Sequence, residues 1–368
     1  MLRALIPAAA AGAVAAAAAA GCSWNREWDD TRYLCPDGTC PAGQECRAGR
    51  CEPAESGSDK PPWWDPDWTL RRPLLIDNRA AEPVPAGMAI GWVSDLDALV
   101  GPNHRDLQVV RWTGSEWIRL ETFADGQPDT QETLWFELDA DLPVDRRDSR
   151  HWVYYGYVDS PLEPTMDPPE GFGFDLWDSF DGAAIDPALW SWFGDVSLVA
   201  GNLVVGPGGQ IRTQATWAPD HAVDIKLNLV APLSQSFWLG FQHPDDDTVD
   251  DEPLALWSYR GDAEGTMSAE FWMSTTGEPR WSTPDVEVPG EDAEHTFTVV
   301  RLAAGATYWH ENELRLTYQL PDGAVPNTEP IQVRVVNDGA APLTVERIRV
   351  RPAIDPAPAL TLGDEQSP

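Results

Sequence analysis

Tryptophan is the side chain that stands out for chemistry, because the chain has 19 of them and several alternate with polar residues. The string SFWLGFQ places Trp238 and Gln242 on one side of a strand and three apolar residues on the other. The string MSAEFWMS separates Glu270 and Trp272 from apolar residues in the same way. An indole covers the apolar face of a sugar, while amide and carboxylate groups bind its hydroxyls. These four residues are the predicted ligand-binding set.

The arrangement of the strands decides whether that set forms one site. If the two strands neighbour each other in a sheet, the two indoles form a platform with an amide and a carboxylate beside it. Trp257 and Tyr259, in LALWSYR, are weaker members of the same set. The alternative for either tryptophan is that a loop or a neighbouring domain covers it.

Clustered aspartates raise the question of a metal. Asp245, Asp247 and Asp250 belong to the acidic stretch HPDDDTVDDE. Calcium takes six to eight oxygen ligands, which such a loop can supply. The spacing does not match an EF-hand, so a solvated acidic loop is the alternative. Calcium is the one cofactor that the sequence suggests.

Catalytic motifs do not emerge. There is no His-Glu-x-x-His helix, no Gly-x-Ser-x-Gly elbow and no phosphate loop, and the six histidines show no metal-ligand spacing. A retaining glycosidase needs two carboxyls about 5–5.5 Å apart. The string Glu-x-Asp-x-x-Glu, which would supply them, is absent from residues 171–352. The sequence therefore predicts that the chain is not an enzyme, with a divergent polysaccharide hydrolase as an alternative.

Four of the five cysteines lie close together, at Cys35, Cys40, Cys46 and Cys51. An even number in an exported chain predicts two disulfides, for which three pairings are possible. A zinc site is the alternative, although the short paired spacing of zinc ribbons is missing.

The fifth cysteine follows a short charged start and an alanine-rich run that ends in Ala19–Ala20–Gly21–Cys22. A run of this kind is typical of a secretory signal. The ending resembles the lipobox of bacterial lipoproteins, which implies a signal peptide over 1–21 and a lipid on Cys22. By the same analogy, Ser23 implies the outer membrane or cell surface. The string CPDGTCPAGQECRAGRC resembles the small Cys-rich modules that follow the lipidated cysteine of myxobacterial-type surface proteins, which implies the pairs Cys35–Cys46 and Cys40–Cys51. Residues 22–51 are thus expected to be a lipidated tail with a two-disulfide module.

The formal charge of -35 bears on partners. Binding to a phosphate backbone depends on Lys and Arg, so this charge makes nucleic acid an unfavourable partner.

Turn residues divide the rest of the chain. Residues 52–62 read as a linker, and four prolines interrupt regular structure near 161–171. Short runs with a period of two lie on both sides of that join, and they predict an all-β protein of two antiparallel β-sandwich (jelly-roll-like) domains after the disulfide-rich module. In the first block, the candidate strands are Leu70–Ile76, Met88–Val93, Leu107–Trp112, Glu116–Thr122, Thr133–Leu138 and His151–Tyr157. We expect residues 353–368 to be a disordered tail.

Two resemblances accompany these blocks. Residues 63–165, with WTLRRPLLIDN and HWVYYGYVDS, resemble an uncharacterised family of β-sandwich domains. Residues 171–352 resemble a concanavalin-A-like or laminin-G-like jelly roll through FDLWDSFDGAAIDPALWSWF and HTFTVVRLAAGATYWHENELRL. In the latter, Glu311–Asn312 occupies the tight turn, since Asn tolerates positive φ.

Together these observations predict a cell-envelope lipoprotein, held in the membrane by its lipid, that acts as a non-catalytic surface binding or adhesion protein. Carbohydrate is the leading ligand class. The alternative from another class is a structural envelope or appendage component that binds protein partners.

Overall fold

The computed structural model describes residues 44–47, 50–53, 60–94, 107–125, 132–157, 168–229, 235–243, 254–260, 266–272, 281–282, 293–319 and 328–368. The chain divides into two compact units, Met1–Pro62 and Trp63–Pro368. The described residues form antiparallel strands and no helix, which confirms the predicted all-β class.

In the first unit, β1 (Gln44–Arg47) pairs with β2 (Arg50–Pro53), and the register places Cys46 opposite Cys51. Cys22, Cys35 and Cys40 lie outside the described residues, as do the side chains of Cys46 and Cys51. The lipid anchor and the disulfides therefore remain predictions.

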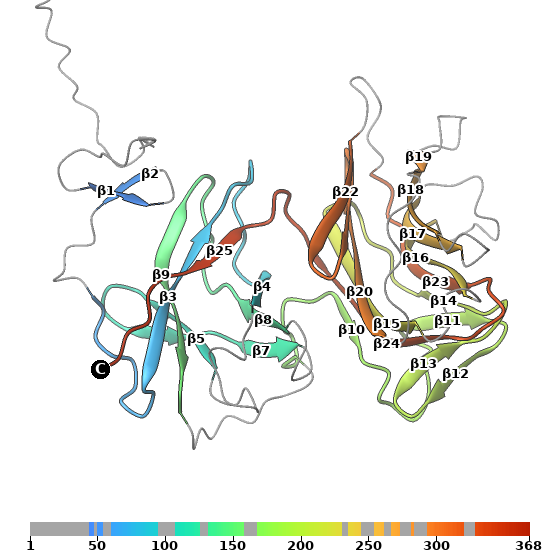
Figure 1. Cartoon of the computed structure of the whole chain (residues 1–368), viewed down its shortest axis with the longest axis horizontal. Coiled ribbons are helices and arrows are strands. Elements are labelled where there is room, and N and C mark those ends of the chain that lie inside the picture. The colour runs from blue at the N-terminus through green and yellow to red at the C-terminus, as the bar shows by residue number, and fades with distance from the viewer. Residues whose placement is uncertain are drawn as a thin grey trace, which may run out of the picture. The chain divides into compact units, whose positions relative to one another are not determined.

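The second unit begins with a β-sandwich of two described sheets (Figure 1). One sheet has the order β25 (Ala359–Leu362), β3 (Leu70–Asp77), β9 (Arg147–Tyr155), β5 (Gln108–Trp112), β6 (Trp117–Arg119). The other has the order β4 (Ala89–Ser94), β8 (Glu132–Glu137), β7 (Thr122–Asp125). Leu74, Val109, Phe136 and Val153 are fully buried between them. Alternation of apolar residues thus locates this core correctly.

One predicted strand of this sandwich differs from the structure. Glu116–Thr122 is not continuous, because the chain changes sheets between β6 and β7. The buried Gln108 side chain stabilises this change by donating to the Leu120 carbonyl at 2.8 Å and to the Thr122 hydroxyl at 3.1 Å. A side-chain hydrogen bond of this kind produces no periodic pattern in the sequence, so the change of sheet could not be predicted from alternation.

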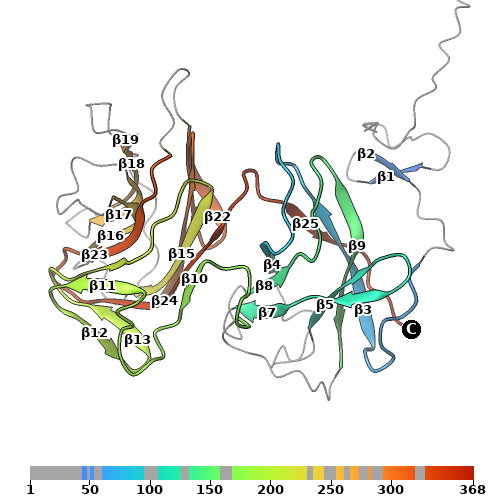
Figure 2. The same ribbon diagram turned by 180° about the vertical axis from the view of Figure 1, so that it is seen from behind.

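The C-terminal residues 353–368, expected as a disordered tail, are ordered instead. β25 pairs with β3 at the sheet edge, as both views of the ribbon show (Figures 1 and 2). Leu360 and Leu362 pack against the first core, and the Tyr155 hydroxyl donates to Glu365 at 2.5 Å. The edge of β3 thereby gains backbone hydrogen bonds.

The second sandwich contains a larger pair of described sheets. The eight-stranded sheet has the order β12 (Val196–Val199), β13 (Asn202–Val205), β24 (Leu343–Pro352), β15 (His221–Leu229), β20 (Ala293–Leu302), β21 (Gly305–His310), β22 (Glu313–Gln319), and β10 (Leu176–Asp178) also pairs with β24. The seven-stranded sheet has the order β11 (Trp190–Phe193), β14 (Gln210–Thr213), β23 (Gln332–Asn337), β16 (Ser236–Gln242), β17 (Leu254–Arg260), β18 (Thr266–Trp272), β19 (Trp281–Ser282).

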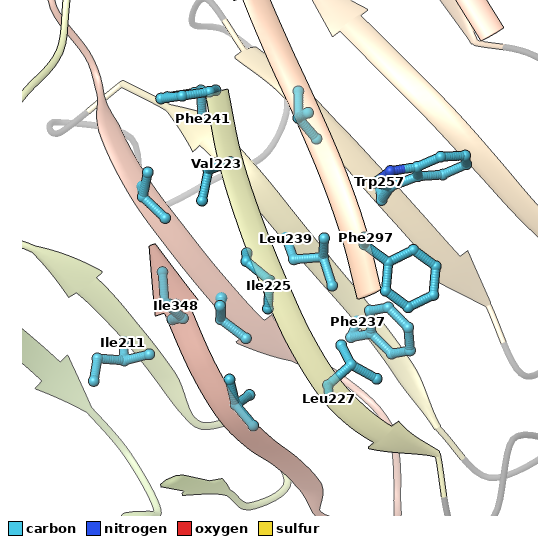
Figure 3. Packing of buried hydrophobic residues seen from close by; sticks show 14 of the residues in the cluster. Ile211, Val223, Ile225, Leu227, Phe237, Leu239, Phe241, Trp257, Phe297 and Ile348 are labelled. Carbon is cyan, nitrogen blue, oxygen red and sulfur yellow. The ribbon is translucent and has the colours of Figure 1, made fainter. Parts of the chain in front are cut away.

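The core of this sandwich lies between those sheets. Figure 3 shows Ile225 and Phe297 of the eight-stranded sheet among Phe237, Leu239 and Trp257 of the seven-stranded sheet, and all five are essentially inaccessible to solvent. This packing fixes which face of each strand points outward.

Charged residues join the two sandwiches. Arg349 of β24 binds Asp125 of β7 and also donates from Nε to Asp224 at 2.7 Å. Arg347 binds Asp125, and Arg351 binds Asp224 at 3.0 Å. We call Asp125, Asp224, Arg347, Arg349 and Arg351 the ionic network.

Burial alone raises the pKa of Asp224, but the charges of Arg349 and Arg351 together with a hydrogen bond from Thr298 hold that pKa well below its usual range. The guanidinium of Arg349 also lies 4.2 Å from the ring centre of Trp135, whose indole nitrogen is buried without a hydrogen-bond partner. The carboxylates of the ionic network, by contrast, are all paired.

Candidate functional site

The candidate site lies on the outer face of the seven-stranded sheet, where β16 runs through the middle. Phe237, Leu239 and Phe241 point into the core, which confirms the predicted inward face of this strand. Trp238 and Gln242 therefore face outward. Trp238 is partly buried, and Gln242 is only 3% exposed.

β17 corrects part of the sequence interpretation. Trp257 and Tyr259 are fully buried in the core, so they are not members of an outward-facing set. The outward positions of β17 are held by Leu254, Leu256 and Ser258 instead. The alternation in LALWSYR is equally compatible with either assignment, because both of its faces are largely apolar.

The register separates the two predicted tryptophans. β17 lies between β16 and β18, so Ser258 pairs with Trp238 on one side and Ser268 on the other. Leu254 similarly stands between Gln242 and Trp272. Two strand spacings and four residues along the strand amount to roughly 16 Å. The structure thus places Trp238 and Trp272 at separate points of one sheet and not side by side.

Glu270 is the remaining member of the predicted set, and it pairs with Leu256. The strand positions of Glu270 and Trp272 are described, but their side chains are not. Asp245, Asp247 and Asp250 lie outside the described residues. The calcium prediction therefore stays a prediction.

Four neutral polar atoms on β23, β16 and β17 are buried and have no hydrogen-bond partner. They are the Trp238 indole nitrogen, the Gln242 amide nitrogen, the Ser258 hydroxyl and the Gln332 amide oxygen. The register pairs Trp238 with Ser258 and Gln242 with Gln332. We call these four residues the unpaired polar set. Sequence analysis missed Ser258 and Gln332, because isolated polar residues in strands normally face water.

An unpaired buried polar group typically costs about 1–3 kcal/mol. Four such atoms lie on three adjacent strands of this sheet. Two of the atoms, on Trp238 and Gln242, donate, the Gln332 oxygen accepts, and the Ser258 hydroxyl does both. This combination matches a ligand whose hydroxyls both donate and accept.

A glycine lies at the centre of β16. Gly240 has a φ of +141°, and a Cβ on it would lie 2.5 Å from the Ala255 carbonyl oxygen. No other residue fits there without a shift of β17. Gly240 lies between Trp238 and Gln242 and is buried, so the close approach of β17 accounts for the glycine.

Arginines and an aromatic ring extend the same face toward β11. Arg212 donates from Nε to the Ser191 hydroxyl at 3.2 Å, and Arg334 binds Gln210. Phe193, opposite Gln210, is 70% exposed. Among the side chains that the structure describes on this face, none is a carboxylate. The described part of the face is therefore suited to binding hydroxyls and stacking on a ring.

The histidines contain a cluster that sequence analysis missed. His295, His310 and Glu311 offer ligand atoms that all lie within 4.8 Å of one another. The sequence HTFTVVRLAAGATYWHE has a histidine near each end of a hairpin. In the structure β20 and β21 form that hairpin, and His310 pairs with Phe297, two residues from His295. Glu311 and Asn312 form the following turn with φ of +50° and +59°, which confirms the predicted tight turn.

No helix among the described residues is both long and apolar enough to cross a membrane.

The second sandwich is an antiparallel β-sandwich of two large sheets. Solved structures similar to the chain include glycoside hydrolases. A family 16 enzyme of Bacteroides ovatus, solved with a mixed-linkage glucan product, is 11% identical, with a TM-score of 0.38, 48% of this chain covered and 99% of that chain. An endo-β-1,3-glucanase from Pyrococcus furiosus is 10% identical, with a TM-score of 0.39 and coverage of 52% and 95%. An immunostimulatory antigen and pseudo β-1,3-glucanase of Mycobacterium tuberculosis is 14% identical, with a TM-score of 0.39 and coverage of 49% and 99%.

No protein-family model matches the chain. No curated protein matches it either.

The structural matches correct one prediction from the sequence. We expected a chain that is not an enzyme, whereas the similar solved structures include glycoside hydrolases.

Proposed function

We propose that the outer face of the seven-stranded sheet binds a glycan chain. The observation that carries this proposal is the unpaired polar set, in which Trp238, Gln242, Ser258 and Gln332 each keep a buried polar atom without a partner. Sugar hydroxyls would supply the missing donors and acceptors.

The test uses the indole nitrogen of Trp238. The full chain is titrated by calorimetry with soluble neutral polysaccharides, among them β-1,3-glucan and mixed-linkage β-glucan. Trp238→Phe keeps an aromatic ring and removes the N–H, so we expect binding to weaken roughly tenfold, about 1.4 kcal/mol. The free energy of unfolding should stay the same or rise, because an unpaired donor has been removed.

Trp112→Ala is the matched control. Trp112 is also a partly buried tryptophan, but it lies in the first sandwich against Trp117, with ring centres 5.1 Å apart. We expect this variant to bind glycan as the wild type does. Equal affinities of the wild type and Trp238→Phe for every polysaccharide bound, or no binding of any, would contradict the proposal. If oligosaccharides are released in the same samples, the chain also hydrolyses the polysaccharide.

We also propose that the chain is a lipoprotein of the cell envelope, anchored through Cys22. The support is the small-residue run that ends in Ala19–Ala20–Gly21–Cys22. Cys22→Ser should move the protein from the membrane fraction to the soluble fraction, and the intact mass of the wild type should include a diacylglycerol. Wild-type protein without that added mass would contradict the anchor.

A further inference from the structure

The cluster of His295, His310 and Glu311 lies at one end of the core of the second sandwich, on the eight-stranded sheet and apart from the unpaired polar set. His295 follows the inward alternation of Phe297 and Val299 on β20, and His310 follows that of Ala306 and Tyr308 on β21. Both imidazoles are buried. The Glu311 side chain is 41% exposed, so the cluster opens to solvent on the carboxylate side.

Three atoms converge in this cluster. His295 Nδ1 lies 3.2 Å from His310 Nε2 and 3.5 Å from Glu311 Oε1, and His310 Nε2 lies 3.8 Å from the same oxygen. Zinc in a tetrahedral site binds nitrogen and oxygen at about 2.0–2.2 Å, which places neighbouring ligand atoms roughly 3.3–3.5 Å apart. The three separations are close to the edges of one face of such a tetrahedron.

Either one shared proton or a bound cation can satisfy the three converging atoms. A neutral imidazole has one N–H and one acceptor nitrogen. If His295 Nδ1 carries the proton, that single proton faces two acceptors. If His310 Nε2 carries it, the His295 Nδ1 lone pair faces a carboxylate oxygen. A divalent cation at the centre accepts all three lone pairs.

The surroundings prepare the ligands for a metal. The Thr296 backbone N–H donates to Glu311 Oε1 at 2.7 Å, which holds the carboxylate in place as a supporting contact does in metal sites. Imidazole nitrogens and carboxylate oxygens are ligands that zinc takes in proteins.

We propose that His295, His310 and Glu311 form a site for a divalent transition metal of the zinc type, with water as a fourth ligand. Two imidazoles and one carboxylate are a ligand set that zinc uses with one open position. The ion would tie the β20–β21 hairpin to the turn that begins β22.

The test measures zinc binding by the full chain after chelator treatment and removal of the chelator. Free thiols are alkylated first, so that cysteines in the N-terminal unit cannot contribute. Glu311→Gln preserves the size of a partly exposed side chain and removes its charge. His221→Gln is the matched control, because His221 lies outside the cluster and pairs with Asp175.

We expect the wild type and His221→Gln to retain one more equivalent of zinc after dialysis than Glu311→Gln and His310→Gln. Zinc at about a hundred times its Kd should raise the Tm of the wild type by roughly 5 °C or more, and this rise should be lost in the two cluster variants. Equal zinc content in all four proteins, or a Tm rise that survives in Glu311→Gln, would overturn the proposal. The Glu311 side chain is partly exposed, so we expect Glu311→Gln to fold. The Tm of this variant without zinc checks its folding.

Discussion

Two of the places where the second sandwich buries polar groups differ in how those groups are paired. At its boundary with the first sandwich, every carboxylate of the ionic network is paired with arginine. On the outer face of the seven-stranded sheet, the unpaired polar set has neutral atoms without partners. Buried charges demand pairing because their desolvation is expensive. Neutral groups can be left unpaired at smaller cost.

The largest effect should come from breaking the ionic network. Arg349→Met leaves Asp224 and Asp125 each without one of their arginines, and the unfolding free energy should fall by about 3–5 kcal/mol. Urea denaturation of the full chain measures this. A loss below 1 kcal/mol would mean that the ionic network is not fully desolvated. The contrast between the ionic network and the unpaired polar set would then be wrong for the ionic network.

Acid should act on the same network. The pKa of Asp224 is lower in the folded chain than the value of about 3.9 expected when unfolded. The stabilisation from this ion pairing is therefore fully present above about pH 5 and is lost as the pH falls below 4 toward the folded pKa. Unfolding free energies measured from pH 6 to pH 3 should show that loss. In Arg349→Met, the pKa of Asp224 is lowered less, so the loss over the same pH range should be smaller than in the wild type.

Two hydroxyls of the seven-stranded sheet test the comparison within one sheet. The Thr213 hydroxyl is fully buried and paired, since it donates to the Ala215 carbonyl at 2.9 Å and accepts from the Val333 N–H at 3.0 Å. Thr213→Val should cost about 1–3 kcal/mol of unfolding free energy. Ser258, equally buried, has no partner for its hydroxyl. Ser258→Ala should be neutral or stabilising by up to about 1 kcal/mol, and a cost equal to that of Thr213→Val would remove the distinction.

The smallest expected effect concerns the amide of Gln242. Gln242→Leu keeps the volume and removes a buried N–H without a partner. We expect unchanged stability and glycan binding weaker by up to tenfold, which is about 1.4 kcal/mol or less. Chemical denaturation and calorimetry on the same sample measure both quantities. Lost stability with intact binding would show that the amide serves packing alone.

The strands of both sandwiches could be predicted from alternation, and most of the expected strands in the first sandwich overlap those observed. Alternation of apolar and polar residues indicates which side of a strand is buried. Phe237, Leu239 and Phe241, which are buried in the core, confirm this for β16. Alternation does not report the order of strands. The separation of Trp238 from Trp272 by β17 therefore could not be predicted, nor could the pairing of β25 with β3.

Site residues are harder to predict for a similar reason. Ser258 and Gln332 become notable only when their atoms are both buried and unpaired, and that is a property of the packed sheet. His295 and His310 are 15 residues apart and meet because a hairpin folds between them. The arms of that hairpin were recognisable, but the residues facing each other across them depend on a register that a single sequence does not fix.

The pairing of β25 with β3 makes the second sandwich an insertion within the first. The polypeptide leaves the first sandwich after β9, builds the second through β24, and returns to complete the sheet that it left. The two sandwiches are therefore joined by two covalent crossings and not by one linker. A fragment ending near residue 165 would expose the hydrogen-bonding edge of β3, and an exposed edge of this kind promotes aggregation. The second sandwich, by contrast, could be excised at both crossings and replaced by a short bridge without removing any strand of the first.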